Sequence, residues 1–399
     1  MLVTRFLIGP IVAATIVSTA SASAADVPRT GKIRWEIKQI ADDLNEGVDV
    51  ADVNRDGVLD IVAGPDWYEG PAWKRRPLRD VGCGNKEFRQ NNGDHVYDVN
   101  GDGWVDVISA SWFSDKLHWY ENPGKKGLAD CEKWKQHLIV GEQGNCEGTL
   151  FVDVDGDGVP EIVPNSWNRD HPATIVRMIP GRDGQPPQFE AFTVGGKGYG
   201  HGVGVGDING DGRPDLLVGK GWYEAPSGFW GEKWKFHEGF DFAHFSLPTL
   251  IVDLTGDGKN DIIIGQAHDY GLRWPEHGPV QDWRITSTAH AIVRFFSHLH
   301  GKAFVDLDGD GKNELVTGKR YRGHADGDPG AHDPTCLFRF LWDAGAKRFE
   351  RDVISYDAGV STGMQIRAVD LNGDKKTDLV VGGKSGTYVL YNRGPSTGQ

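Results

Sequence analysis

A stretch of nine residues near the middle of the chain carries four oxygen-bearing side chains at a fixed spacing. Asp207, Asn209, Asp211 and Asp215 occupy positions 1, 3, 5 and 9 of this stretch, and Gly212 occupies position 6, where a sharp reversal needs a positive φ. Carboxylate and amide oxygens are ligands of hard cations, and six or seven of them suit Ca²⁺ better than Mg²⁺. A single copy of such a pattern is more commonly a solvated turn. Recurrence therefore decides whether it indicates calcium binding.

The pattern recurs seven times, at separations of 46 to 64 residues, which makes a solvated turn a poor explanation. The seven copies begin at Asp52, Asp98, Asp153, Asp207, Asp253, Asp306 and Asp370. The predicted calcium ligands are Asp52, Asn54, Asp56, Asp60, Asp98, Asn100, Asp102, Asp106, Asp153, Asp155, Asp157, Glu161, Asp207, Asn209, Asp211, Asp215, Asp253, Thr255, Asp257, Asp261, Asp306, Asp308, Asp310, Glu314, Asp370, Asn372, Asp374 and Asp378. Two loops are weaker, because Thr255 stands at position 3 of one and Lys375 at position 6 of the other.

Repeats of this length are typical of arrays of supersecondary units, so each acidic loop must belong to one unit. In the fourth repeat GHGVGVGD leads into the loop, DLLVGK leaves it, and WYEAP and KWKFHEGF follow, each bounded by Gly or Pro as strands are. Seven four-stranded sheets predict an all-β fold, a seven-bladed β-propeller with the calcium loops on one face. The last repeat stops after three strands, and we expect residues 32–40, KIRWEIKQI, to supply the fourth and remove the open edge.

The acidic loops followed by apolar strands resemble the repeats of FG-GAP/VCBS-type β-propellers over nearly the whole chain. A narrower resemblance rests on residues 200–226, on AHDYGLRW (267–274) and on LVTGKRYRGHADGDPGAHDP (315–334). These stretches are similar to the propeller domain of aldos-2-ulose dehydratase and its bacterial propeller-only relatives, which implies dehydration of a sugar by elimination. The chain departs from that pattern in lacking cupin domains and in reading SHLH at 297–300.

The N-terminal residues and the charge indicate where the chain works. Residues 1–24 combine Arg5, an apolar stretch and a small-residue end, as a secretory signal peptide does, so we expect residues 25–399 to be a secreted or periplasmic propeller. No other run is apolar enough to span a membrane. The seven loops hold 23 of the 57 acidic residues, so metal-binding loops account for most of the net charge of −14 and the charge says little about partners. The sequence has no basic stripe of the kind that binds nucleic acid. Four cysteines could pair, and Cys83 with Cys146 is the pair we favour.

A second constellation appears six residues before each first loop Asp. The seven residues there are Glu46, Asn92, Glu147, His201, Leu247, His300 and Met364. Inner strands that only pack would begin with small or apolar residues, yet five of these are polar. Each His alone is more often a satisfied polar residue beside buried water. Two His and two Glu on one ring can hold a divalent metal or perform acid-base chemistry, and both alternatives stay open.

The loops between second and third strands lie on this same face and add aromatic and basic groups. We expect Trp112, Trp167, His268, Tyr270 and His324 to contact a sugar, although many repeated aromatic residues of propellers only pack between blades. The loop GKRYRGHADGDPGAHDP concentrates cations, Tyr and His beyond the needs of a turn. It is either a solvated surface loop or a lid carrying Lys319, Arg320 and Tyr321.

These features predict a secreted carbohydrate-active lyase or dehydratase that acts by elimination on an oxidised sugar or uronate, at the channel face opposite the calcium loops. Elimination beside a carbonyl needs a base, a cation that holds the enolate, and an acid for the leaving oxygen. We assign base or metal-ligand roles to His201 and His300, ligand roles to Glu147 and Glu46, and acid or enolate-binding roles to Tyr321 with Lys319 or Arg320. The alternative is a non-catalytic propeller that binds glycans or proteins. Hydrolysis by Glu46 and Glu147 across the channel stays open too.

Overall fold

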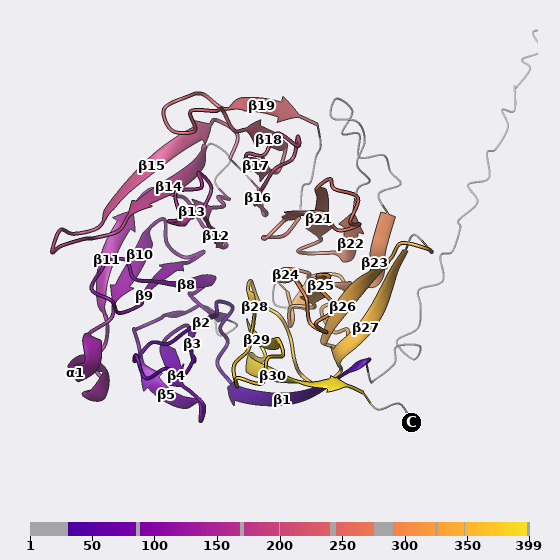
Figure 1. Cartoon of the computed structure of the whole chain (residues 1–399), viewed down its shortest axis with the longest axis horizontal. Coiled ribbons are helices and arrows are strands. Elements are labelled where there is room, and N and C mark those ends of the chain that lie inside the picture. The colour runs from indigo at the N-terminus through magenta and orange to yellow at the C-terminus, as the bar shows by residue number, and fades with distance from the viewer. Residues whose placement is uncertain are drawn as a thin grey trace, which may run out of the picture.

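The computed structural model describes residues 31–84, 88–167, 171–198, 200–239, 245–274, 290–323, 326–346 and 348–396. The predicted signal peptide, residues 1–24, and His324 lie outside these ranges. Seven four-stranded antiparallel sheets follow one another around a central axis, as Figure 1 shows. The predicted all-β, seven-bladed propeller is therefore confirmed.

The first four blades use strands in simple chain order. Blade one contains β2 (Asp49–Ala51), β3 (Asp60–Ala63), β4 (Asp66–Glu69) and β5 (Lys74–Pro77). Blade two contains β8 (Gly93–Tyr97), β9 (Asp106–Ala110), β10 (Leu117–Glu121) and β11 (Lys135–Val140). Blade three contains β12 (Thr149–Val152), β13 (Glu161–Pro164), β14 (Ala173–Ile179) and β15 (Gln188–Gly195). Blade four contains β16 (Gly204–Gly206), β17 (Asp215–Val218), β18 (Gly221–Glu224) and β19 (Lys235–Glu238).

The remaining blades complete the ring. Blade five contains β20 (Leu250–Val252), β21 (Asp261–Gly265), β22 (Tyr270–Trp274) and β23 (His290–Ser297), and blade six contains β24 (Lys302–Val305), β25 (Glu314–Gly318), β26 (Cys336–Asp343) and β27 (Arg348–Tyr356). Blade seven contains β28 (Ile366–Val369), β29 (Asp378–Gly383), β30 (Gly386–Pro395) and β1 (Ile33–Ala41). A small hairpin of β6 (Cys83–Gly84) and β7 (Phe88–Arg89) and the short helix α1 (Gly124–Ala129) decorate the first two blades.

The N-terminal strand closes the ring as predicted. β1 pairs antiparallel with β30, and Ile37 lies opposite Leu390. In Figure 1 the indigo β1 lies beside the yellow β30, although the two strands come from opposite ends of the chain. Pairing covers the edge of β30 that a three-stranded blade would leave open.

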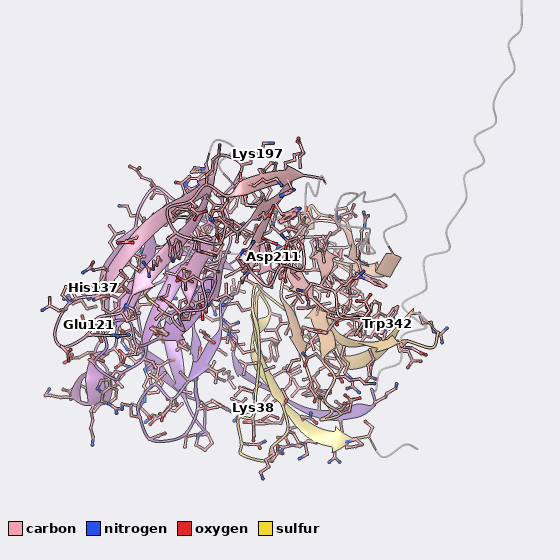
Figure 2. All side chains as sticks on the ribbon, turned by 45° about the horizontal axis from the view of Figure 1, so that its top comes forward. Lys38, Glu121, His137, Lys197, Asp211 and Trp342 are labelled. Carbon is pink, nitrogen blue, oxygen red and sulfur yellow. The ribbon has the colours of Figure 1, made fainter. Side chains whose placement is uncertain are left out.

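Burial along the strands explains why their sequences differ. The second strand of each blade is buried on both sides, as in β17, where all four residues of DLLV are buried between neighbouring blades. The outermost strands face solvent, so most residues of β15 and β11 are exposed or only partly buried. Figure 2 shows Lys38 and His137, on outermost strands, around the outside of the ring.

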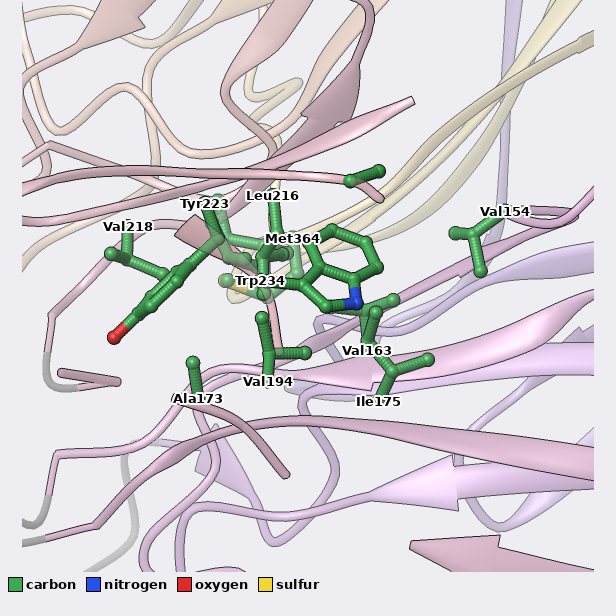
Figure 3. Packing of buried hydrophobic residues seen from close by; sticks show 13 residues of the cluster. Val154, Val163, Ala173, Ile175, Val194, Leu216, Val218, Tyr223, Trp234 and Met364 are labelled. Carbon is green, nitrogen blue, oxygen red and sulfur yellow. The ribbon is translucent and has the colours of Figure 1, made fainter. Parts of the chain in front are cut away.

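Apolar clusters between successive blades hold the ring together. One cluster joins blades three and four, where Trp234 and Tyr223 pack against Val163 and Ile175 (Figure 3). Met364 of blade seven reaches the same cluster across the axis. Burial of such apolar surface is the main favourable contribution to folding.

The expected cysteine pairing is wrong, because all four cysteines are free. Cys83 is exposed in the β6–β7 hairpin, whereas Cys146 is buried at the start of blade three and donates from Sγ to the carbonyl of Gly148 at 3.0 Å. A thiol engaged inside its own blade cannot also meet an exposed one without movement of the backbone.

Candidate functional site

Three of the residues that precede inner strands meet at the channel axis. His201 Nε2 lies 2.9 Å from Glu147 Oε2, and His300 Nε2 lies 3.4 Å from Glu147 Oε1. The three side chains are buried and come from blades four, three and six. Because each inner strand continues from this level to an acidic loop at its other end, the cluster and the acidic loops occupy opposite faces.

His268, from the loop between β21 and β22, completes a three-imidazole cluster. Its Nε2 lies 2.5 Å from Nε2 of His201, and ligand nitrogens of His201, His268 and His300 lie within 4.8 Å of one another. Nδ1 of His268 lies 2.9 Å from Asp328 Oδ2, and Nδ1 of His300 makes a long 3.5 Å contact with the carbonyl of His298. Both partners only accept, so the protons sit on Nδ1 and both Nε2 lone pairs face the cluster.

These donors fit a divalent transition metal. Imidazole nitrogens and one carboxylate are suitable ligands. Metal-bound histidines typically donate their other ring N–H to a carboxylate or a backbone carbonyl, as His268 does to Asp328 and His300 does to His298. His201 differs, because its Nδ1 is buried without a hydrogen-bond partner in the described part of the chain. Nε2 of His201 is the nitrogen that faces Glu147.

Electrostatics favours an ionised Glu147 in the cluster. Burial opposes ionisation of Glu147, but its pairing with His201, and then with His300, outweighs burial and holds the pKa of Glu147 well below its usual range. Burial, assisted by the nearby charge of Arg320, holds the pKa of His300 well below its usual range. The site therefore presents an ionised carboxylate beside an uncharged imidazole, which is the state that binds a metal.

Arg320 ties the cluster to blade one. Its guanidinium makes a bidentate ion pair with Glu46, and both side chains are buried. Its Nη1 also lies 3.2 Å from His300 Nε2 and 3.5 Å from Glu147 Oε1. Glu46 is thus held by an arginine, and the arginine places a fixed positive charge against the cluster.

An aromatic wall lines the cluster on the side of blades two and three. The ring of Trp167 packs edge-on against His201 at 4.8 Å between centroids, and its Nε1 donates to Glu147 Oε2 at 3.2 Å. Trp112 follows at 5.8 Å from Trp167, and its backbone N–H donates to Asn92. Such a wall suits the apolar face of a sugar ring.

Apolar side chains separate the cluster from the rest of the channel. Leu247 and Met364 are buried at the same level as Glu147, and a methyl group on Gly148 would lie 3.0 Å from one and 3.3 Å from the other. Below them lies a cavity of about 430 Å³ whose lining includes His95 and Lys302. Leu247 and Met364 also line this cavity.

Three other predicted site residues lie in the long loop or beside it. The ammonium of Lys319 is buried and donates to the carbonyls of Arg320 and Ala331, so it supports its own loop. Tyr321 is half-buried, and Cζ of Arg322 lies over its ring, 5.3 Å from the ring centroid. Tyr270 donates from its hydroxyl to Asp333 at 2.7 Å, and burial with this bond raises its pKa to about 12. His324 falls outside the described residues.

Two residues of the cluster escaped the sequence analysis. Asp328 accepts from His268 and lies 3.4 Å from His298 Nε2, while His298 also contacts the hydroxyl of Ser297 at 2.8 Å. Burial, followed by the charge of Lys319, lowers the pKa of His298 to about 4. The acidic residues within the long basic loop were the available signal for Asp328.

On the other face, each acidic loop folds its side chains around its own backbone. In the first loop, Asp52 accepts the N–H groups of Asp56 and Gly57 at 3.0 and 2.9 Å. The position-9 carboxylate, Asp60, is buried and accepts from Val53 and Gly70, so it joins the loop to the far end of β4. The same two-oxygen clamp recurs at Asp106, Asp215 and Asp378.

The loop of blade three best fits a cation. Ligand oxygens of Asp153, Asp155 and Glu161 lie within 4.8 Å of one another. One oxygen of Glu161 accepts from Val154, but Oε1 is buried without a partner in the described residues. Burial raises the pKa of Glu161 to about 7. In blade six the corresponding oxygen of Glu314 accepts from Arg339. The positive charge of this arginine stands where the loop of blade three has an oxygen without a partner.

No helix in the described ranges is long and apolar enough to cross a membrane.

Comparisons with known proteins agree with the architecture. A family model described as an FG-GAP-like repeat matches residues 98–163, and a model of the FG-GAP repeat matches residues 199–228. No curated protein matches the chain by sequence. Two crystal structures of BBS1N in complex with ARL6DN, soaked with lead and with mercury, superpose with TM-scores of 0.51 and 0.53, over 93% of this chain and 99% of those chains. Their identities of 12% and 11% limit the similarity to the fold.

The matched segments cover acidic loops together with the strands that follow them. Residues 98–163 run from the loop of blade two through the loop of blade three, and residues 199–228 contain the loop of blade four. Together with the seven-bladed ring, these matches identify the chain as a β-propeller that contains FG-GAP repeats.

Proposed function

We propose that the histidine cluster is the active site of a carbohydrate-active lyase or dehydratase, which eliminates water or an alcohol from an oxidised sugar or uronate. The observation that carries the proposal is the convergence of three imidazoles and an ionised carboxylate beside an aromatic wall. An arginine against the same cluster supplies a permanent positive charge. Few purely structural roles require this combination in a buried site.

The contacts divide the chemical roles among the residues. His268, His300 and Glu147 would hold a divalent metal, which would polarise a carbonyl or carboxylate oxygen of the substrate when bound. Nε2 of His201 takes the α-proton of the substrate and then delivers a proton to the leaving oxygen, so that water or an alcohol is released. Arg320 stabilises negative charge that develops on the substrate oxygen, and Glu46 keeps its guanidinium in place. Trp167 and Trp112 support the sugar ring.

We also propose that the acidic loops bind Ca²⁺ and that the protein is secreted. The orphan oxygen of Glu161 beside Asp153 and Asp155 supports a cation there. The signal-like N-terminus supports export to a compartment where Ca²⁺ is plentiful, and neither nucleic acid nor a membrane is expected as a partner.

A turnover screen tests the proposed reaction. Elimination beside a carbonyl leaves a conjugated double bond, so oxidised sugars and uronate oligomers are incubated with the protein and ultraviolet absorbance is followed. His201→Ala should abolish the signal with channel metal retained, whereas His300→Ala should lose both, and His137→Ala on the outside of blade two serves as a matched control. Equal turnover in both cluster variants and the parent would refute the proposal.

The alternative is a non-catalytic propeller that binds glycans or proteins on the same face. It predicts that ligands bind without any conjugated product, and that His201→Ala changes affinity alone. BBS1N, whose fold is similar, was crystallised in complex with ARL6DN, and this keeps the alternative in the test.

A further inference from the structure

A second cavity opens beside the histidine cluster on the same face. It has a volume of about 190 Å³ and lies between blades one and two. Its lining includes Arg79, Ser109, Phe113, Lys116, His118 and Tyr120. The loop between β9 and β10 separates the two sites, because Trp112 of this loop borders the aromatic wall and the adjacent Phe113 borders the cavity.

Arg79 is the unusual residue of this cavity. Its side chain is 2% exposed, its Nη2 pairs with Asp94 at 2.5 Å, and its guanidinium stacks over the ring of Tyr120 at 4.5 Å. Its Nε and Nη1 are buried without hydrogen-bond partners among the described residues. Unmet donors on a buried guanidinium are costly, so a ligand that accepts from them is favoured.

Charge and shape narrow the class of that ligand. Lys116 is exposed at the cavity, and His118 has a pKa that is lowered by burial and then by Lys116 and Arg79. The acid that lines the cavity, Asp80, is paired with Lys133 at 2.5 Å, and Asp94 is paired with Arg79. Phe113 is 41% exposed and offers an apolar ring. An anionic group attached to a sugar-like ring matches both features.

We infer that this cavity binds the carboxylate and ring of a second sugar unit, in an acidic oligosaccharide whose reacting unit lies at the histidine cluster. The inference rests on the proposed function and narrows its substrate class to oligomeric uronates. Arg79 and Lys116 hold the carboxylate, Phe113 contacts the ring, and Ser109 and His118 hydrogen-bond the hydroxyls. The loop that carries Trp112 and Phe113 lies between the two bound units.

Calorimetric titration of the full chain with trimers of galacturonate, glucuronate and mannuronate tests the inference. Their methyl esters keep the rings and remove the charge. Lys116→Ala and Phe113→Ala should each weaken binding of at least one trimer about fivefold, because both side chains are exposed and their loss spares the fold. Lys38→Ala is the matched control and should bind like the parent. Lys38, labelled in Figure 2, lies on the outer strand β1. Arg79→Lys should weaken binding further.

Several outcomes would overturn the inference. They are the absence of binding by all three trimers, equal binding of the methyl esters, and parental affinity in both Lys116→Ala and Phe113→Ala. The same variants separate this inference from the proposed reaction. Trimer binding that depends on Lys116, with no conjugated product, counts against catalysis alone. If turnover requires His201 but Lys116→Ala has the same KM as the parent, the result counts against the second sugar site alone.

Discussion

Nδ1 of His268 lies 2.9 Å from Oδ2 of Asp328, and this contact joins the second loop of blade five to the long loop of blade six. A carboxylate only accepts, so the imidazole proton is held on Nδ1 and the Nε2 lone pair points at His201 and His300. The orientation of one proposed metal ligand is therefore set by a residue from a neighbouring blade.

Replacing this carboxylate should weaken metal binding without unfolding the protein. Asp328→Asn keeps the shape but lowers the basicity of His268, and outer partners of this kind typically contribute 10- to 100-fold to metal affinity. Competition with a chromogenic chelator measures the change. Asp326→Asn, which alters the exposed pair with Arg322 in the same loop, should have no effect. Equal metal affinity in both variants would show that Asp328 does not position a ligand.

Removal of calcium should destabilise the propeller. The acidic loops cluster carboxylates on one face, and a cation that binds only the folded state adds about 2.7 kcal/mol per site at 100 times its Kd. Excess chelator should lower the Tm markedly, and added Ca²⁺ should restore it. Asp153→Asn, in the loop where Glu161 has an orphan oxygen, should reduce the shift. A melting curve that is unchanged after verified metal removal would contradict calcium binding.

The seventh acidic loop should gain stability from a glycine. Lys375 occupies position 6 with φ of 64°, where the other six loops have glycines with φ between 84° and 88°. A side chain in this left-handed region costs about 1 kcal/mol or more. Lys375→Gly should therefore raise the free energy of unfolding by about 1 kcal/mol. Lys376→Gly, at the next position, should not, and a lower Tm for Lys375→Gly would contradict the strain.

Stability should fall as the pH drops from about 6.5 to 4, in part because of His95. Burial, followed by the charge of Arg367, lowers the pKa of His95 to about 4, so the unfolded chain takes up this proton at higher pH than the folded protein does. The contribution is fully present above about pH 6.5 and amounts to about 3 kcal/mol. His95→Gln, measured by urea unfolding at several pH values, should flatten the slope in this window, whereas His137→Gln should leave it unchanged.

Loss of β1 should expose the seventh blade. Deletion of residues 32–40 removes the strand that covers β30, and an uncovered edge is prone to aggregation. We expect an insoluble protein or one with a much lower Tm. Substituting Ile37, which lies opposite Leu390, with Asp should act in the same direction but less strongly. A soluble deletion variant with parental Tm would show that another contact closes the ring.

The fold could be predicted because its information is local in the sequence. Each acidic loop and the strands around it are specified by spacing within some ten residues, and the period of the repeats then determines a ring of seven blades. The strand KIRWEIKQI belongs to no other repeat, and the last repeat lacks its fourth strand, so the pairing of this strand with β30 could be predicted too.

The candidate site could be predicted only in part. Position in the repeat placed Glu147, His201 and His300 at one level of the channel, because every inner strand begins there. The partners of these residues depend on contacts across the ring, such as that between Arg320 and Glu46, which are 274 residues apart. Asp328 and the cluster role of His268 come from loops without a repeated pattern, so the tertiary structure alone decided them. Strand spacing repeats along the chain, whereas loop conformation depends on side chains packed from several blades.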